Sequence, residues 1–413
     1  MSALGIGRTP RLALALGLLA STAGPVLATE SFDPKQAEVR ETKRWGRLEL
    51  LEDKSKHLPQ ERYIPLVEHH APEIRAAFKT GAPSSQLVLL HYAKGWKEAQ
   101  AKHPDLPPVI LVHGAGMSSN HCFASHPIEQ PYEGLAARLT RAGRATFAVT
   151  FSHVHGDNYL QAEQLCNAIA RVRQVTGAKK VDLVAHSKGG MPARIYLSSA
   201  GPKWTTPFRK DVRRYVMLGT PNGGIDVSFA YPNLNYWILE HKSPAPLSWT
   251  GGYYYGKWLD WADQNLYGPR SPFPGQAQMV ARFRGRYGLT TAKGQLDVET
   301  TYEGGRGQVS EGFGIDRAIK DGGNCIAQLK TKPIHPSVEL AALAGTGDWI
   351  MGLVGERRAP SDGLLLVSSA LDTDSMTKGG ATLIRRSMRR FNHLQLVYDP
   401  RANDWVEETL AQK

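Results

Sequence analysis

The decapeptide Val181-Asp-Leu-Val-Ala-His-Ser-Lys-Gly-Gly190 constrains the fold of this chain more than any other segment. A short apolar run predicts a β-strand, and a helical pattern begins near Met191, so Ser187 occupies the turn between them. Ala185 and Gly189 are small, which lets the strand and the helix approach closely. The pattern is typical of a nucleophile elbow, where a strained backbone exposes the serine Oγ and the first free N–H groups of the helix face a reacting carbonyl.

A second apolar run, Pro107-Pro-Val-Ile-Leu-Val-His-Gly-Ala-Gly116, precedes the first along the chain. It reads as a buried strand that ends in a His-Gly turn, and such a turn can supply a backbone donor for an oxyanion. The alternative is a core strand that merely ends in a glycine turn. Because the two segments occur in the order that a serine hydrolase requires, their combination favours the catalytic interpretation.

Two segments downstream carry candidates for the acid and the base. They are Ser361-Asp-Gly-Leu-Leu-Leu-Val-Ser-Ser-Ala370 and Phe391-Asn-His-Leu-Gln-Leu-Val397, so the chain order is Ser, Asp, His. With these motifs the chain resembles the secreted bacterial lipases, which share the Ala-His-Ser-x-Gly turn, the Asp-Gly-Leu loop and the Asn-His-Leu segment. The resemblance covers roughly residues 107 to 225 and 338 to 400, and not the stretch between them.

The resemblance implies an α/β-hydrolase in which Ser187 is the nucleophile, Asp362 the acid and His393 the base, with the backbone amides of Ala115 and Lys188 as oxyanion donors. The chain also departs from these lipases. Where some of them bind calcium through an acidic residue two positions after the histidine, this chain has Gln395, so no metal or other cofactor is expected. The cysteine that often follows the acid is missing, and the lid region has no visible counterpart.

Other residues compete for the same roles. Asp348 follows a predicted strand and is a rival to Asp362 as the acid. His186 adjoins the serine, but neighbouring residues on a turn point in different directions, so a packing role is the stronger interpretation. His335 precedes its strand and would lie at the wrong end of the sheet.

The remaining pattern supports a mostly parallel sheet covered by helices on both faces. Strands are predicted at 86–92, 109–112, 145–150, 181–186, 214–218 and 338–343, and helices at 71–79, 132–142 and 159–176. We therefore expect one α/β-hydrolase domain over residues 86–413. Residues 29–85 are charge-rich and are expected to form an N-terminal extension, to which the sequence assigns no chemistry.

An insertion at about 226–336 interrupts this alternation. It is rich in aromatic residues, which are Tyr231, Tyr236, Trp237, Trp249, Tyr253, Tyr254, Tyr255, Trp258, Trp261 and Tyr267. Such rings suit a cap over the serine, since each has an apolar body and a polar tip. We expect Trp258 and Trp261 to contact substrate; the alternative is a satellite core in which the rings pack on one another.

The N-terminus resembles a secretory signal peptide. Arg8 and Arg11 precede the apolar run Leu12–Ala20, and Val26-Leu-Ala28 places small residues where a signal peptidase cleaves. The apolar run is too short to cross roughly 30 Å of hydrocarbon, which argues against a transmembrane anchor. Residues 1–28 are therefore predicted to be removed, and the protein is predicted to be secreted or periplasmic.

Charge and cysteine content limit which partners and which redox state are expected for this chain. The formal net charge of +12 comes from dispersed residues, with one short cluster at 385–390, and nothing resembles a nucleic-acid module. Attraction to a lipid–water interface is possible on this charge, although solvated surface is the commoner cause. Cys122, Cys166 and Cys325 predict one disulfide and one free thiol in an oxidising compartment, with the pairing open. Their spacing does not suggest zinc, and the oligomeric state stays open.

Together these features predict ester hydrolysis through an acyl-enzyme, most simply by a triacylglycerol lipase or carboxylesterase. A polyester depolymerase of the polyhydroxyalkanoate type, or a lipid acyltransferase, would use the same residues. A non-catalytic binding module is a more distant alternative, because such proteins usually lack a triad member and all three candidates are present here.

Overall fold

The computed structural model describes residues 32–33, 42, 44–54, 58–124, 133–231, 248–254, 256–260, 267, 271–284, 296–350 and 353–412. The predicted signal peptide lies outside the described residues. Residues 32–413 form one compact unit, in which nine described strands make a single sheet in the order β1-β2-β3-β5-β4-β6-β7-β12-β15.

Six neighbouring strands of this sheet, from β5 to β15, run parallel, and β1, β2 and β3 join them through antiparallel pairs. The strands are β1 (Phe32–Asp33), β2 (Arg47–Asp53), β3 (Leu87–Tyr92), β4 (Val109–Val112), β5 (Thr146–Phe151), β6 (Val181–His186), β7 (Val212–Leu218), β12 (Glu339–Gly345) and β15 (Thr382–Arg389). The central strands are buried on both faces, which explains why they read as continuous apolar runs.

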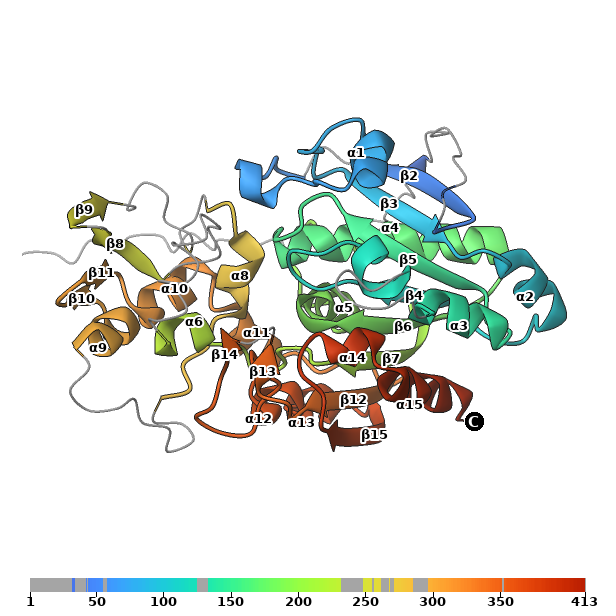
Figure 1. Ribbon diagram of the computed structural model, residues 1–413. Coiled ribbons are helices and arrows are strands. Elements are labelled where there is room, and N and C mark those ends of the chain that lie inside the picture. The colour runs from blue at the N-terminus through green and yellow to red at the C-terminus, as the bar shows by residue number, and fades with distance from the viewer. Residues whose placement is uncertain are drawn as a thin grey trace, which may run out of the picture. The chain divides into compact units, whose positions relative to one another are not determined.

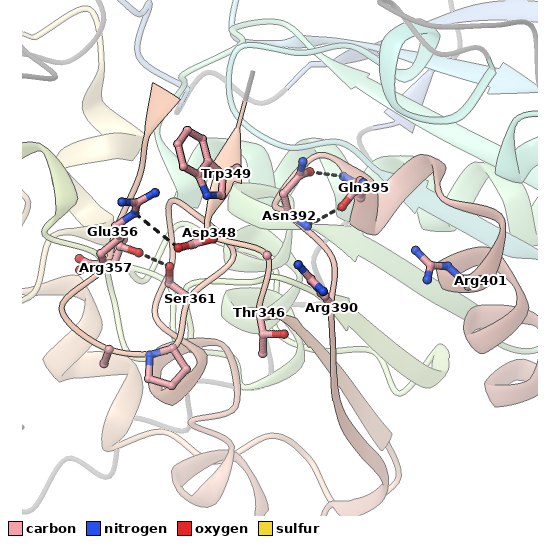
Figure 2. Close-up of a pocket in the computed structure, with 13 residues that line it drawn as sticks. Thr346, Asp348, Trp349, Glu356, Arg357, Ser361, Arg390, Asn392, Gln395 and Arg401 are labelled. Carbon is pink, nitrogen blue, oxygen red and sulfur yellow. Dashed lines mark hydrogen bonds and ion pairs between the residues drawn. The ribbon is translucent and has the colours of Figure 1, made fainter. Parts of the chain in front are cut away.

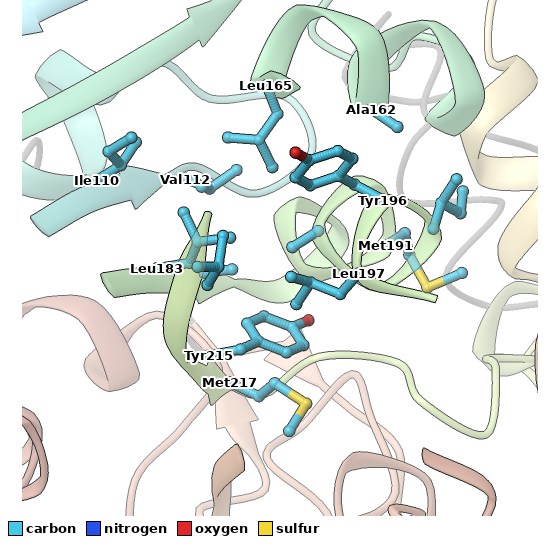
Figure 3. Close-up of a cluster of buried hydrophobic side chains, with 14 of the residues drawn as sticks. Ile110, Val112, Ala162, Leu165, Leu183, Met191, Tyr196, Leu197, Tyr215 and Met217 are labelled. Atoms are coloured by element: carbon cyan, nitrogen blue, oxygen red, sulfur yellow. The ribbon is translucent and has the colours of Figure 1, made fainter. Parts of the chain in front are cut away.

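Alternate residues of each central strand enter two different cores. Ile110 and Val112 belong to one buried cluster and Val109 and Leu111 to the other. The first cluster lies under α4 (Asn158–Thr176) and α5 (Gly190–Leu197), as Figure 3 shows around Leu183. The second lies under α3 (Leu135–Arg141), α14 (Gln395–Tyr398) and α15 (Pro400–Ala411), on the other face of the sheet in Figure 1.

A mostly parallel sheet that is covered on both faces and carries a serine turn at the carboxyl end of a central strand is the α/β-hydrolase fold, as predicted. Short elements connect the strands: η1 (Pro65–Val67), α1 (Pro72–Phe78), α2 (Trp96–Lys102), η2 (Asn120–Ala124), η3 (Ser187–Gly189), β13 (Trp349–Ile350), β14 (Leu353–Val354), α12 (Val367–Ala370) and α13 (Asp374–Thr377).

The insertion between β7 and β12 contains a four-stranded sheet and several short helices. They are α6 (Val227–Ala230), β8 (Trp249–Tyr254), β9 (Lys257–Asp260), α8 (Pro274–Met279), α9 (Leu296–Glu303), β10 (Gly305–Arg306), β11 (Ser310–Gly312), α10 (Ile315–Asp321) and α11 (Cys325–Lys330). Backbone hydrogen bonds from Ile225 to Met279 and from Gly275 to His155 attach the insertion to the main sheet and its loops.

The expectation of a disulfide is wrong, because all three cysteines are free and buried. Cys122 packs in the core on one face of the sheet and Cys166 in the core on the other, while Cys325 lies at the start of α11. Burial raises the pKa of Cys122 and Cys166 to about 12 and that of Cys325 to about 11, so each behaves as a small apolar side chain with an inert thiol.

Candidate active site

The turn that carries Ser187 is built on close contacts that only glycine permits. β6 ends at His186, and Ser187 begins η3 with φ 53°, a strained conformation for a residue with a side chain. A Cβ at Gly189 would lie 2.3 Å from the carbonyl oxygen of His113, and one at Gly190 would lie 2.3 Å from Thr220 Oγ1. The helix can therefore start directly behind the serine, as the small-residue pattern predicts.

Ser187, His393 and Asp362 come together although they are far apart in the sequence. His393 Nε2 lies 2.8 Å from Ser187 Oγ, and His393 Nδ1 lies 2.7 Å from Asp362 Oδ2. Since the carboxylate can only accept, Nδ1 carries the proton and Nε2 is left to accept the serine hydroxyl. This is the geometry that a serine nucleophile and its general base require.

Backbone groups hold the Asp362 carboxylate in place. Its Oδ1 accepts hydrogen bonds from the N–H groups of Leu364 at 3.1 Å and Leu365 at 2.8 Å, which leaves Oδ2 for the histidine. Two glycines that the sequence reasoning missed make room for this pair. A Cβ at Gly219, where φ is +55°, would lie 3.2 Å from Asp362 Oδ2, and one at Gly345 would lie 2.8 Å from Asp362 Cβ.

The rival acid Asp348 lies elsewhere. Its carboxylate pairs with Arg357 at 3.4 Å on the edge of a cavity of about 1000 Å³ beside the acid and base loops (Figure 2). In the same view Gln395 and Asn392 face each other: Gln395 Oε1 accepts from the Asn392 N–H, and Asn392 Oδ1 accepts from the Gln395 N–H, both at 2.8 Å. Gln395, two positions after the histidine, thus holds the loop of His393 in place.

The turn after β4 packs directly on the serine. A Cβ at Gly114 would lie 3.0 Å from Ser187 Cβ, so a side chain there would crowd the serine. The ring of His113 fixes this turn: its Nδ1–H donates to the Gly114 carbonyl at 2.7 Å, and its Nε2 accepts from the Phe151 N–H at 3.2 Å. Burial lowers the pKa of His113 to about 3, which keeps the ring neutral in this role.

His186 also has a structural position. Its Nε2 donates to the carbonyl of His393 at 2.9 Å, and the two rings lie 4.8 Å apart. Burial lowers the pKa of His186 to about 3, and no hydrogen bond connects its ring to the serine hydroxyl among the described residues. It supports the loop of the base, in agreement with the packing role that the sequence favours.

The side chain of Lys188 is buried and meets a group of polar residues that the sequence reasoning missed. Lys188 is 1% exposed, and its Nζ donates to Gln161. Glu61 accepts from the Asp157 N–H at 2.6 Å, and both carboxylates attract the ammonium. Burial lowers the pKa of Lys188 to about 7 and raises that of Glu61 to about 8, and it raises the pKa of Asp157 as well. The run His153–Asp157 follows β5, and polar residues at the carboxyl end of a parallel strand are a signal that could have found part of this group.

Two pairs of aromatic residues of the insertion contact each other among the described residues. Trp258 lies against Tyr253 with ring centroids 4.8 Å apart, and the Arg306 guanidinium lies 4.6 Å from the Trp258 ring. Tyr267 packs with Phe229 in a buried cluster that also contains Val67 of the N-terminal extension and Val154. Trp261 lies outside the described residues. The substrate contacts expected for Trp258 and Trp261 therefore stay predictions.

No group of three or more His, Cys, Asp or Glu side chains in the described part of the chain could hold a metal ion. Among the helices that the structure describes, none combines the length and the apolar character needed to cross a membrane.

Comparison with known proteins places part of this chain beside lipases. Residues 86–234 match a family model described as a domain of unknown function, DUF7379. The chain is similar to triacylglycerol lipases of Pseudarthrobacter phenanthrenivorans (30% identical over 119 residues, 28% of this chain and 34% of that protein) and Vibrio cholerae (33% over 102 residues, 23% and 28%). The chain spans about a third of the length of these curated relatives.

Solved structures with a similar arrangement include the Bacillus licheniformis lipase BlEst2 in its mature form, with a TM-score of 0.42 and 17% identity over 74% of this chain and 93% of that one. Carboxylesterase CesB from Bacillus subtilis aligns with a TM-score of 0.36 and 13% identity over 78% and 86%.

Proposed function

We propose that this chain is an exported serine hydrolase that cleaves carboxylic esters, as a triacylglycerol lipase or a carboxylesterase. The observation that carries the proposal is the hydrogen-bonded series Asp362–His393–Ser187, with distances of 2.7 and 2.8 Å on a strained serine turn. The likeness to triacylglycerol lipases over about a quarter of the chain supports the ester class of substrate.

In the proposed mechanism His393 takes the proton of the Ser187 hydroxyl as the Oγ attacks the ester carbonyl, and the same proton then goes to the leaving alcohol. Asp362 holds the imidazole in the required tautomer and stabilises its charged form. The N–H groups of Ala115 and Lys188 receive the oxyanion, and each such donor is worth roughly 3 kcal/mol in comparable enzymes. Water attacks the acyl-enzyme through the same base and releases the acid.

Ser187→Ala tests this proposal. Loss of the Ser187 hydroxyl should lower the rate of hydrolysis of p-nitrophenyl esters by about 10⁴-fold or more, for short and long acyl chains alike. Ser198→Ala is the matched control, because Ser198 caps the C-terminus of α5 and its hydroxyl donates to the Arg194 carbonyl at 2.6 Å, away from the triad. Purified Ser187→Ala protein that kept a tenth of the wild-type turnover would refute the serine mechanism.

Export is part of the same proposal and has its own test. The leader at residues 1–28 supports it, with cleavage after Ala28. Expression of the full chain in a bacterium should yield protein outside the cytoplasm whose N-terminal residue is Thr29. Recovery of the chain from the cytoplasm with its leader intact would contradict export and leave the ester hydrolase proposal standing.

A further inference from the structure

A second cavity, of about 250 Å³, opens beside the turn after β4. Three segments line it: Leu66–Ala71 from the N-terminal extension, Gly116–Ser118 with His121 from the turn after β4, and Val154–His155 after β5. The Gly116 N–H donates to the Val154 carbonyl at 3.1 Å, which ties two of these walls together. The cavity starts two residues beyond Gly114, the residue that packs on Ser187, and one beyond Ala115. It therefore borders the turn that carries the Ala115 N–H, one of the two proposed oxyanion donors.

His155 presents a hydrogen-bond donor to this cavity. The side-chain amide nitrogen of Gln276 lies 3.0 Å from His155 Nδ1 and can only donate, so Nδ1 accepts and Nε2 carries the proton. Within the described residues Nε2 has no hydrogen-bond partner, and it faces Gly116, where a Cβ would lie 3.3 Å from it. Burial holds the pKa of His155 well below its ordinary value, so the ring is neutral. The result is an N–H group fixed in direction and left without an acceptor.

The other polar groups of the lining complement this donor. His69 donates through Nε2 to the Ser152 carbonyl at 2.8 Å, which leaves its Nδ1 an acceptor, and burial lowers the pKa of His69. Ser118 and His121 share a hydrogen bond of 3.0 Å, and Glu68 also lines the cavity. Leu66, Ala71, Met117 and Val154 supply the apolar part of the lining. Its polar part thus consists of imidazoles, a hydroxyl and one acidic residue.

An alkyl chain would remove water from these groups without replacing its hydrogen bonds, at a cost of about 1–3 kcal/mol for each group left unpaired. A hydroxyl both donates and accepts, so it matches neutral imidazoles of either tautomer. At ~30 Å³ for a water molecule, the cavity holds the volume of about eight waters, enough for a three-carbon polyol with solvent beside it.

We propose that this cavity is the subsite for a hydroxyl-bearing part of the ester substrate, with the His155 Nε2–H as the donor that recognises the hydroxyl. The inference rests on the proposed ester hydrolase and names the class of its substrates. The hydroxyl can come from a polyol that is esterified or from a hydroxylated acyl group, and the two sources share this chemistry. His155 then contacts substrate and determines specificity, while Ser187 and His393 carry out the reaction.

Two pairs of esters separate these sources. Glyceryl monobutyrate against propyl butyrate tests a hydroxylated alcohol, and ethyl 3-hydroxybutyrate against ethyl butyrate tests a hydroxylated acid. In at least one pair the wild-type chain should favour the hydroxylated ester by about tenfold in kcat/KM, the effect of one good hydrogen bond. The pair that shows the preference identifies the source, and a wild-type preference in neither pair overturns the proposal.

His155→Phe should bring the ratio close to one by slowing the hydroxylated ester and leaving the other within about threefold. His155→Gln, which restores an N–H donor, should recover part of the preference, and Gln276→Leu should reduce it by releasing the tautomer. His335→Phe is the matched control, since His335 bonds to Ser337 just before β12, and it should keep the wild-type ratio. Each ratio is taken within one preparation, so a partly unfolded variant still reports it.

Equal losses on both esters of a pair in His155→Phe would overturn the subsite and assign His155 to the support of the turn. That result is distinct from failure of the proposed function, which would appear as wild-type turnover no greater than that of Ser187→Ala on all four esters.

Discussion

Replacing Lys188 by Met should make the stability of this protein depend on pH in a new way. The substitution keeps the long stem of the side chain and removes the ammonium that is buried near Glu61 and Asp157. Burial lowers the pKa of Lys188 from 10.5 to about 7, so between these values the unfolded chain holds a proton that the folded chain does not. The contribution of Lys188 to stability therefore rises with pH from 7 to 10.5.

The contribution of Glu61 to stability changes with pH in the opposite direction. Burial raises its pKa from 4.5 to about 8, so the folded chain holds the extra proton between these values and the contribution to stability falls as the pH rises. Each slope is at most about 1.4 kcal/mol per pH unit, because one proton is involved. In the wild-type protein the two slopes oppose each other between pH 7 and 8.

Relative to the wild type, the free energy of unfolding of Lys188→Met should fall by about 2–3 kcal/mol between pH 7 and 9. Glu61→Gln should show the reverse, a relative gain of about 2–3 kcal/mol between pH 6 and 8. Urea unfolding at half-unit pH steps measures both. Lys330→Met is the control: Lys330 forms a partly exposed pair with Asp372 and should shift stability by less than about 1 kcal/mol at every pH. Profiles of the two variants that ran parallel to the wild type would refute the reasoning.

Three further outcomes are expected. Asp362→Asn should lower kcat for p-nitrophenyl esters by roughly 10⁴, because the amide favours the wrong imidazole tautomer, whereas Asp348→Asn should stay within a few-fold; the reverse ranking would transfer the role of the acid. Trp258→Ala should reduce kcat/KM for palmitate esters more than for butyrate esters if the insertion shelters acyl chains, and equal losses would favour a satellite core. Arg358→Met leaves the buried carboxylates of Asp226 and Glu356 without their cation and should cost about 3–5 kcal/mol in urea unfolding. Arg357→Met, at an exposed pair, should cost about 0–1 kcal/mol, and similar costs would contradict this account.

Five of the six parallel strands of the sheet, all except β15, could be predicted because their information is local. β4 and β6 are buried on both faces and appear as short apolar runs, so composition alone marks them. β2 and β15 were missed for the opposite reason. In β2 the charged Glu49 is stabilised by Arg171 of α4, and in β15 Arg385 donates to the Trp405 carbonyl of α15, contacts that no local pattern contains. The arginines of β15 also suit an edge strand, where charge discourages pairing with another chain.

The candidate active site also contains both residues that the local sequence identifies and residues that depend on distant contacts. Ser187 stands out from its local turn, but Asp362 was preferred to Asp348 only because its Asp-Gly-Leu loop resembles that of the lipases, and the position of Asp348 after a predicted strand kept it as a rival. Their difference lies in distant partners, since Asp362 meets His393 and Asp348 meets Arg357. The predicted disulfide failed because counting cysteines does not say whether two thiols meet: Cys166 and Cys325 belong to the same buried cluster and are still free.

The N-terminal extension is the clearest case of chemistry that the sequence could not reveal. Its residues pack against the catalytic side of the sheet at two separate places. Glu61 contributes to the charge around Lys188, and residues 66–71 form a wall of the second cavity. Both places adjoin a proposed oxyanion donor, the amide of Lys188 in one case and of Ala115 in the other. The extension therefore acts on the environment of the oxyanion from outside the strands that supply its donors, and it does so with polar groups whose partners are distant in the chain. A charge-rich segment without a motif thus contributes residues both to the surroundings of Lys188 and to the proposed hydroxyl subsite.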